Sequence, residues 1–531
     1  MADSTEPVSP AFELTGVFTP ANGVNDRAYA RNHVEASATP AGAGALPVPR
    51  RSLLSHASAG VAAIGLAALM QREGAELRAD EQRRPAAASL APGVPGLHHA
   101  AKATSVIHIF LGGGLSQVDS FDYKPELEKY HDRDLPPSFG TADAFFGKVG
   151  RLHKAHYPFH QRGDSGLWIS DLFPELAKSA DHLCVIRSMN AETANHIPGI
   201  FQANTGFRQM GFPAMGAWLS YGLGSENEDL PTFIVLPDSR GIPNAAGGAF
   251  NWSSGFLPAQ HQGVAFQTRS DQPIPDLTPS EPVADEVVQQ RTALLRLMNE
   301  QHLASQAETD PLQARIRSYE LAARMQRAIP EAMNLSSEPE HIQKLYGMDR
   351  EECRDVARNC LAARRLVERG VRVVQIWTGD GVSWDAHGDI LGNGYKSHSG
   401  EALRVDRPIH GLIQDLAQNG LLESTIVMIT TEFGRTPYAQ SSQGTLSRGR
   451  DHHPEGFTNL LLGAGLKRGI AYGETDEIGY SAIVNPVTTY DLHATVLHLM
   501  GIDHERLTVY HNGLQRRLTN VHGQVIEEIL S

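Results

Sequence analysis

The chain has 531 residues, of which 41% are hydrophobic and 20% are charged, and this composition is typical of globular proteins. Its formal net charge of −14 excludes general affinity for nucleic acid, because the phosphate backbone would repel it. The 3 cysteines cannot form a disulfide framework. Cys353 and Cys360 share one face of a predicted helix, so we expect them to be small buried groups.

The first 90 residues are predicted to form a disordered extension followed by an export signal. Residues 1–49 are rich in Ala, Pro, Ser, Thr and Gly and lack periodicity, so we predict a disordered extension. Arg50 and Arg51 precede an uncharged run at 52–70, which is similar to a twin-arginine export signal. We therefore expect residues 50–90 to be a signal and linker, and the protein to be periplasmic or extracellular. The alternatives are a core helix or an uncleaved anchor, the one membrane contact that we expect.

The remaining chain alternates between strand-like and helix-like segments. The first is an apolar run at 105–111 that ends in three glycines, at 112–114. After it, the patterns predict an irregular segment at 131–165, a helix at 171–180, strands at 183–189 and 231–237, a loop at 240–280, helices at 285–307, 311–328 and 351–368, a strand at 371–377, a helix within 405–422, a strand at 425–429, a polar loop at 447–455, a strand at 459–462 and a helix at 488–500.

This alternation predicts an α/β fold with a mostly parallel sheet and helices on both of its faces, a three-layer α/β/α sandwich. The run at 425–429 is apolar without polar alternation, which is typical of a parallel strand that is covered on both sides. We predict one domain at 100–531, in which the helices at about 285–328 are an insertion. No repeat of fixed period is visible.

Three polar loops follow predicted strands, and each carries ionisable side chains. Together they contain Asp385, His387, Glu432, Arg435, Arg450, Asp451, His452 and His453. This mixture of carboxylates and imidazoles suits zinc, manganese, iron, magnesium or calcium, and the arginines suit an anionic oxygen. Open α/β sheets bind ligands at the carboxyl ends of their strands, so we predict a site there. For each residue alone, the alternative is a turn cap, a surface hydrogen bond or a salt bridge.

Several segments resemble a known family. They are IHIFLGGGLSQVDSFDYKPEL, LPTFIVLP, CLAARRLVERGVRVVQI, TTEFGRTP, GRDHHPEGF and NPVTTYDLHATVLHLMGIDHERL. They closely resemble the domain of unknown function 1501 (DUF1501) family, which is exported, often with a twin-arginine signal. That family resembles the alkaline phosphatase and sulfatase superfamily. The resemblance implies an alkaline phosphatase-like α/β/α sandwich with a metal-dependent site at the strand ends.

The resemblance also assigns individual residues. Glu432 stands where the superfamily has an Asp ligand, and Phe433 where it has a His or Asn ligand. His452 takes the place of a late metal-binding His, and the segment of Asp385 and His387 is similar to an Asp…His segment. Because Phe cannot bind a metal, one ligand position of the superfamily is lost.

Two further departures concern the nucleophile and the first strand. The first strand usually ends in a metal-binding Asp, whereas here it ends in glycines and Asp119 is the nearest substitute. HIPGIFQANTG is similar to the sulfatase nucleophile motif but places His196 at the nucleophile position, which argues against a formylglycine mechanism. Ser116 and Thr193 are alternative nucleophiles.

The leading hypothesis is an exported, metal-dependent hydrolase of a phosphate or sulfate ester, whose substrate is an anionic small molecule or glycan ester. The expected cofactor is one or two divalent ions: zinc, manganese, calcium or magnesium. The predicted ligands are Asp385, His387, Glu432, Asp451 and His452. We expect His196 to attack or act as a general base, and Arg435 to stabilise the departing anion. Further candidates are Asp119, Ser116, Thr193, His453 and Arg450.

Two other classes of function fit the same residues. Phe433, the three glycines and His196 favour a catalytically silent protein of the same fold that binds an anionic glycan or a partner in the cleft. A structural envelope protein would hold neither metal nor ligand. Turnover of an ester would distinguish the hydrolase from the silent binding protein. Bound metal would distinguish the hydrolase from the structural envelope protein.

Overall fold

The computed structural model describes residues 97–139, 148–238, 246–275, 277, 283–304, 310–379, 381–441 and 446–531. All of them belong to the unit Ala87–Ser531. The predicted N-terminal extension (1–49) and export signal (50–90) lie outside the described residues, so both stay predictions.

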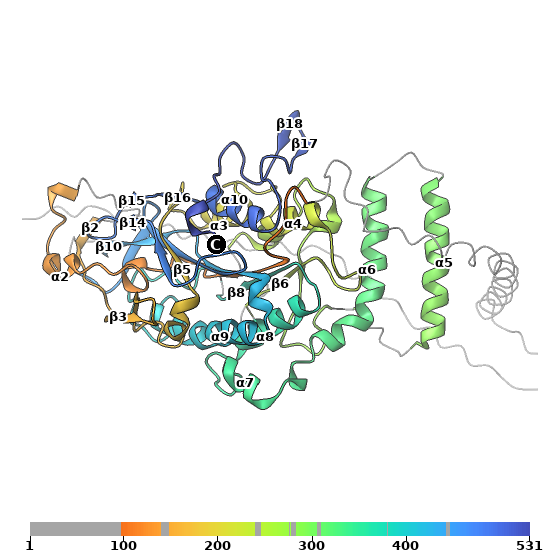
Figure 1. Cartoon of the computed structure of the whole chain (residues 1–531), viewed down its shortest axis with the longest axis horizontal. Coiled ribbons are helices and arrows are strands. Elements are labelled where there is room, and N and C mark those ends of the chain that lie inside the picture. The colour runs from red at the N-terminus through yellow and green to blue at the C-terminus, as the bar shows by residue number, and fades with distance from the viewer. Residues whose placement is uncertain are drawn as a thin grey trace, which may run out of the picture. The chain divides into compact units, whose positions relative to one another are not determined.

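A nine-stranded sheet forms the centre of this unit (Figure 1). Its strands follow the order β13 (Ile470–Tyr472), β5 (Cys184–Asn190), β12 (Phe457–Gly463), β9 (Thr425–Thr430), β1 (Ser105–Phe110), β8 (Val373–Trp377), β6 (Phe233–Leu236) and β7 (Val264–Ala265), and β16 (Val487–Thr488) also pairs with β5. β12 runs antiparallel to both of its neighbours, and the other pairs are parallel. The predicted α/β class with a mostly parallel sheet is therefore confirmed.

Side chains of the central strand β1 alternate between two hydrophobic cores. Ile107 and Ile109 belong to the core beneath α8 (Arg354–Glu368) and α9 (His398–Gln418). Val106 and Phe110 belong to the core on the opposite face. All six residues of β1 are buried, because neighbouring strands pair with both edges and helices cover both faces.

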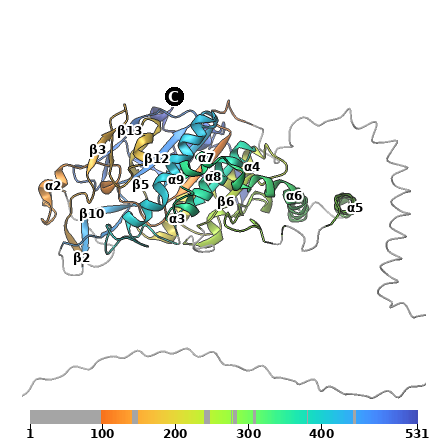
Figure 2. The same cartoon turned by 90° about the horizontal axis from the view of Figure 1, so that it is seen from below.

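The helices lie in two layers (Figures 1 and 2). One face of the sheet carries α7 (Glu340–Tyr346), α8 and α9. The opposite face carries α3 (His196–Thr205), α4 (Met215–Leu223) and α10 (Thr489–Leu499). The remaining helices are α2 (Glu126–Tyr130), α5 (Asp285–Ala304) and α6 (Asp310–Ala332). The predicted insertion forms the two helices α5 and α6. No helix within the described ranges combines the length and apolar character that crossing a membrane requires.

Short elements complete the fold. The small sheets contain β10 (Gly434–Ser441) between β11 (Arg450–His453) and β2 (Lys148–Leu152), and the pairs β3 (Phe159–Arg162) with β4 (Leu167–Ser170), β14 (Glu474–Thr475) with β15 (Ala482–Val484), and β17 (Val509–His511) with β18 (Leu514–Arg516). The 3-10 helices are Gln117–Asp119, Pro137–Phe139, Leu176–His182, Gly248–Trp252, Ala259–His261, Leu335–Ser337, Leu421–Glu423 and Glu527–Ile529.

Several local predictions were wrong. The loop predicted at 240–280 contains β7 of the central sheet and two 3-10 helices. The polar segment 447–455 contains the buried strand β11, and Arg435 lies in strand β10 rather than in a loop, because the charged side chains of this hairpin are paired inside the protein. The irregular segment 131–165 contains β2 and β3. The helix predicted at 171–180 is a 3-10 helix that starts at Leu176, where the Asp406 carboxylate accepts the backbone N–H groups of Glu175 and Leu176 at 2.8 and 2.7 Å.

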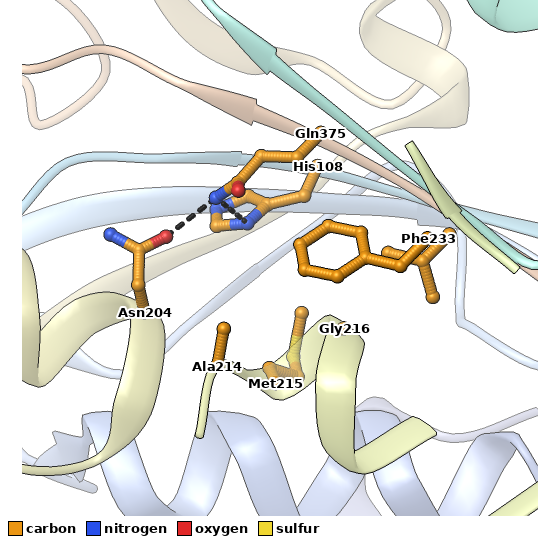
Figure 3. A pocket seen from close by; sticks show the side chains of 8 residues that line it. His108, Asn204, Ala214, Met215, Gly216, Phe233 and Gln375 are labelled. Carbon is orange, nitrogen blue, oxygen red and sulfur yellow. Dashed lines mark hydrogen bonds between the residues drawn. The ribbon is translucent and has the colours of Figure 1, made fainter. Parts of the chain in front are cut away.

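A polar group interrupts the apolar face of the sheet beneath α3 and α4 (Figure 3). The side-chain amide of Gln375 lies between His108 Nδ1, at 3.3 Å, and Asn204 Oδ1, at 2.6 Å. His108 Nε2 lies 2.6 Å from Thr430 Oγ1, and burial lowers the pKa of His108 to about 3. These contacts bind α3 to the central strands, so they position the helix that carries His196.

Candidate metal centre

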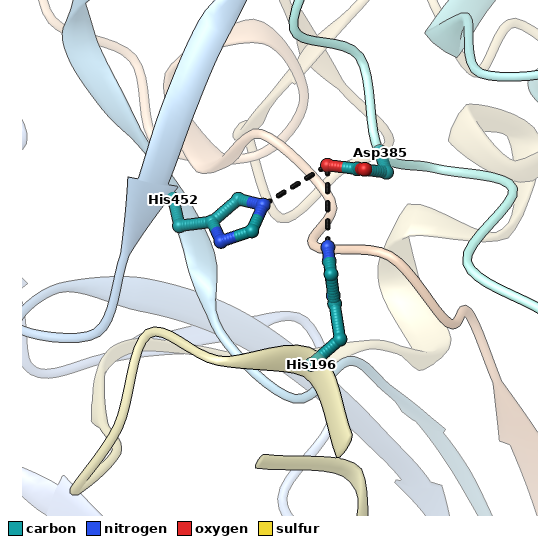
Figure 4. Close-up of side chains that lie close together, drawn as sticks. All are labelled: His196, Asp385 and His452. Carbon is teal, nitrogen blue, oxygen red and sulfur yellow. Dashed lines mark hydrogen bonds and ion pairs between the residues drawn. The ribbon is translucent and has the colours of Figure 1, made fainter. Parts of the chain in front are cut away.

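The candidate site lies where several strands of the central sheet end. The segments after β1, β8 and β9 supply Gly113, Asp385 and Glu432, respectively. His196 comes from the first turn of α3, and His452 from β11. The side chains of His196, Asp385 and His452 converge from three separate elements (Figure 4). The site therefore occupies the position at which α/β sheets bind ligands.

Two glycines allow these segments to approach closely. Gly113 has a φ of 122°, and a Cβ there would lie 2.6 Å from the backbone nitrogen of Trp384. Gly114 has a φ of 84°, and a Cβ there would lie 3.1 Å from Nε of Arg435. A larger residue at either position would strain the backbone and displace its neighbour. The glycine run thus sets the positions of the Asp385 loop and of Arg435.

One oxygen of Asp385 is the centre of the site. Four nitrogen atoms surround Oδ1: His387 Nε2 at 2.8 Å, Arg435 Nη2 at 2.8 Å, His452 Nε2 at 3.0 Å and His196 Nε2 at 3.2 Å. The Arg435 guanidinium is buried, and its Nε also donates to the Gly114 carbonyl at 2.9 Å. Burial opposes ionisation of Asp385, but the contacts of the three histidines and the charge of Arg435 hold the pKa of its carboxyl well below the ordinary value.

The partners of His452 determine which of its ring nitrogens carries the proton. Its Nδ1 lies 2.6 Å from the carbonyl oxygen of Ala194, which only accepts hydrogen bonds, so Nδ1 carries the proton. Burial lowers the pKa of His452 to about 4. Its other nitrogen, Nε2, faces Asp385 Oδ1 at 3.0 Å and His387 Nε2 at 2.9 Å.

His196 is held in a similar way. Its Nδ1 lies 2.7 Å from Oε1 of Glu432, while its buried Nε2 makes no hydrogen bond of good geometry, although Asp385 Oδ1 is 3.2 Å away. Burial lowers the pKa of His196, but the contacts with the Asp385 and Glu432 carboxylates outweigh it and raise the pKa above the ordinary value. Both carboxylates thus orient the Nε2 atom of this ring toward the centre.

These donor atoms fit a divalent cation. His196 Nε2 is a buried nitrogen without a hydrogen bond, and His452 Nε2 faces the Asp385 carboxylate at 3.0 Å, so both nitrogens are placed to bind an ion beside that carboxylate. Two ligand sets within 4.8 Å occur in the described part of the chain: His196, Asp385 and His452, and His387, Asp451 and His452. Metal-binding histidines commonly donate their other N–H to a carboxylate or carbonyl, as His196 and His452 do here.

Glu432 and Phe433 support this centre from behind. The Glu432 carboxylate accepts the backbone N–H of Gly113 at 2.9 Å as well as bonding to His196, so it orients a ligand rather than pointing into the ligand cluster. The Phe433 ring is fully buried and lies 4.9 Å from the His196 ring and 4.8 Å from the His452 ring, centroid to centroid. It therefore packs beside both imidazoles and limits their rotation.

A second buried cluster holds other predicted residues. Asp119 accepts Arg450 Nε at 2.7 Å, Ser116 Oγ at 2.5 Å and the backbone N–H of His156 at 2.7 Å. Against the effect of burial, Arg450 and His156 hold the pKa of Asp119 well below its usual range. His156 Nδ1 also lies 3.0 Å from this carboxylate. The structure thus places Ser116, Asp119 and Arg450 in an ion-pair network outside the Asp385 cluster.

The last two sequence candidates point elsewhere. His453 Nε2 bonds to the Tyr480 carbonyl, and Thr193 Oγ1 accepts the backbone N–H of Asn195 at 3.1 Å. One residue beside the centre was missed: Lys396, whose Nζ lies 3.1 Å from Oδ2 of Asp385. Its sequence signal was weak, because a lysine in a glycine-rich loop is ordinarily a solvent-exposed residue.

Comparisons with known proteins give a family match and only distant similarity to solved structures. No curated protein sequence matches. A protein in the alkaline phosphatase superfamily from Vibrio parahaemolyticus shares 11% identity and a TM-score of 0.35, over 80% of this chain and 74% of its own. Alkaline phosphatase from the Antarctic bacterium TAB5 shares 10% identity and a TM-score of 0.31, over 75% and 98% of the two chains. The C-terminal periplasmic domain of EcEptC from Escherichia coli, solved as a complex with Zn, shares 9% identity and a TM-score of 0.31, over 78% and 87%.

The family match is more extensive. The model described as "Protein of unknown function (DUF1501)" matches residues 103–530, which include every part of the candidate metal centre. The match spans the central sheet from β1 to the C-terminal segment. The chain belongs to the DUF1501 family.

Proposed function

We propose that the protein is a metal-dependent hydrolase of a phosphate or sulfate ester. The observation that carries the proposal is the convergence of three histidine Nε2 atoms on Oδ1 of Asp385, at distances of 2.8 to 3.2 Å. Imidazole and carboxylate donors together suit zinc and manganese better than calcium or magnesium, which prefer oxygen ligands throughout.

The proposed ligands are Asp385, His196, His387 and His452. We propose a single ion. Both candidate ligand sets include His452, and its Nδ1 already donates to the Ala194 carbonyl, so only its Nε2 is left to bind a metal. A divalent ion at this position would supply Lewis-acid charge to a developing oxyanion. Arg435 stabilises the Asp385 carboxylate rather than an open ligand position, because its guanidinium is fully buried among backbone carbonyls.

Water is the proposed nucleophile. Both ring nitrogens of His196 face carboxylates, which supports a role as a ligand rather than as the attacking group. The hydroxyl of Ser116 donates to Asp119. The Asp385 side of the site borders a cleft that is lined by the loop from Gly388 to Ser397, through which an ester and water would enter.

The test is hydrolysis of p-nitrophenyl phosphate and p-nitrophenyl sulfate by the full chain, with zinc or manganese and with a chelator. His452→Ala should abolish hydrolysis, and His261→Ala is the matched control because it is a buried histidine outside the site whose pKa burial also lowers to about 4. Metal-dependent hydrolysis that persists unchanged in His452→Ala would contradict the proposal. Failure of wild type to hydrolyse either ester would favour the second candidate function.

That second candidate is a catalytically silent protein that binds an anionic glycan or a partner in the same cleft. Phe433 favours it, because its buried ring packs beside His196 and His452 at a position where the superfamily resemblance implies a metal ligand. Saturable binding of a sulfated or phosphorylated glycan without turnover would support this function.

We propose further that the protein acts outside the cytoplasm after twin-arginine export, on the basis of Arg50, Arg51 and the uncharged run that follows them. Cell fractionation of wild type and of an Arg50→Lys, Arg51→Lys variant tests this. We expect export of wild type and retention of the variant in the cytoplasm. Equal export of both would contradict the twin-arginine route.

A further inference from the structure

Lys396 lies on the open side of the candidate metal centre. Its Nζ is 3.1 Å from Oδ2 of Asp385, whereas the histidines and Arg435 surround the other oxygen of that carboxylate. The Lys396 side chain is 43% exposed and Asp385 is 7% exposed. Lys396 and Asp385 line the same cleft. The ammonium group can therefore contact both the centre and a ligand that enters from solvent.

The backbone at Lys396 is held in a costly conformation. Its φ is 62°, in the left-handed region that favours glycine, although Lys396 is neither Gly nor the Asn or Asp that tolerate it best. The next residue, Ser397, is the N-cap of α9, and its hydroxyl accepts the backbone N–H of Gly400 at 3.2 Å. Gly394 lies only two positions earlier, so a glycine in this loop could have taken the left-handed position. Strained residues of this kind concentrate at ligand sites.

The charges around the centre indicate what Lys396 would bind. Asp385, Glu432 and Asp451 are acidic, Arg435 and Lys396 are basic, and Asp389, which also lines the cleft, is neutralised by Arg448 at 2.6 Å. With a divalent ion present, positive charge exceeds negative charge by one, the histidines being left aside. Arg435 is fully buried, so Lys396 is the basic residue of this set whose charge is exposed to the cleft. A tetrahedral oxyanion with several acceptor oxygens matches an ammonium with three donors.

We infer that Lys396 is a substrate-binding residue that contacts the phosphate or sulfate group of the ester on the cleft side of Asp385. This inference rests on the proposed function, since it places the oxyanion beside the metal centre. The Nζ of Lys396 contacts Asp385 while its side chain stays partly exposed to the cleft. The residue thereby favours ligands with an anionic group.

The test is titration calorimetry of the full chain, loaded with zinc or manganese, against inorganic phosphate and inorganic sulfate. Lys396→Gln removes the charge, and Lys396→Gly removes the charge while relieving the backbone. Both should raise the Kd for the oxyanion about tenfold or more, as expected for loss of one charge-assisted contact, with metal content unchanged. Lys178→Gln is the control, because Lys178 is a partly exposed lysine paired with Glu175 away from the site.

The outcomes separate this inference from the proposed function. A wild-type Kd for both oxyanions in both Lys396 variants would overturn the role of Lys396 while leaving the metal centre intact. Absence of saturable binding of either oxyanion by the metal-loaded wild type would also overturn it. Loss of bound metal in the Lys396 variants would assign the lysine to metal retention instead. The proposed function fails separately, if wild type holds no metal.

Discussion

Asp385 and Asp119 are two buried carboxylates that strand β11 joins, since Arg450 of that strand reaches Asp119 and His452 reaches Asp385. Each is accompanied by histidine and arginine. Around Asp119, the Arg450 guanidinium, the Ser116 hydroxyl and a backbone N–H all bring protons to the carboxylate. Around Asp385, three histidine Nε2 atoms lie within 3.2 Å of one carboxylate oxygen.

The difference separates an ion pair that holds the fold together from the site that is proposed to bind a cation. The donors and acceptors around Asp119 are complementary, so its network needs no further partner. Asp385 differs, because its Oδ2 faces a cleft beside Lys396. Residue type therefore does not distinguish the two clusters, whereas the convergence of imidazole nitrogens and the open cleft do.

The largest effect is expected from Asp385→Asn. Loss of the central charge should remove the bound metal and lower ester hydrolysis about a thousandfold or more, while the amide oxygen still accepts from Arg435 and preserves the fold. Asp406→Asn is the control, because Asp406 is a buried carboxylate away from the centre. Metal content and initial rates are the measurements. Retention of both in Asp385→Asn would place the metal elsewhere.

Asp119→Ala should act on stability instead. It leaves the Arg450 guanidinium buried without its counter-ion, so the free energy of unfolding should fall by about 3–5 kcal/mol. Urea unfolding at pH 7 measures the loss, and the folded fraction should keep its metal. An Asp119→Leu, Arg450→Met double variant should be more stable than Asp119→Ala, because no buried charge remains. Metal loss with wild-type stability would make Asp119 a ligand.

Glu432→Gln should give an intermediate effect on the Asp385 cluster. Glu432 orients His196 and does not point into the ligand cluster, so we expect metal affinity to fall by about 10- to 100-fold rather than vanish. Competition with a fluorescent chelator measures the Kd. Glu401→Gln changes another buried carboxylate, one that pairs with Arg404, and should leave the Kd unchanged. Complete loss of metal would make Glu432 a direct ligand.

The smallest effect concerns pH. Because the pKa of Asp119 is lower in the folded protein than in the unfolded chain, its contribution to stability is present above about pH 4 and is lost as the pH falls below that value. Asp119→Asn lacks this term. Urea midpoints should therefore differ most between wild type and Asp119→Asn at pH 7, and the difference should shrink toward pH 3. A difference that stays constant from pH 7 to pH 3 would contradict the assignment.

Much of the scaffold was predictable from local pattern. The strands β1, β8 and β9 are continuous apolar runs, and the rule that ligands bind at strand ends led to Asp385, His387 and His452. The β11 hairpin was missed, because its strand consists of Arg, Asp and two His residues, whose burial depends on partners elsewhere in the fold.

Side-chain partnerships could not be predicted in the same way. Asp119 and Arg450 are 331 residues apart, and nothing in the local sequence indicates that they meet. The proton position on His452 depends on the Ala194 carbonyl of another loop. The role inferred for Lys396 rests partly on its backbone φ, which only the folded chain shows. The sequence identifies chemically capable residues, but the fold decides which of them share a site.

Metal content tests the central claim most directly. The full chain would be purified without chelator, incubated with zinc, manganese or calcium, desalted and examined by elemental analysis beside His452→Ala and the control His261→Ala. The predicted result is one zinc or manganese ion per chain in wild type and in His261→Ala, and none in His452→Ala. Wild type that holds no metal under any of these conditions, or His452→Ala that keeps a full equivalent, would contradict the metal centre.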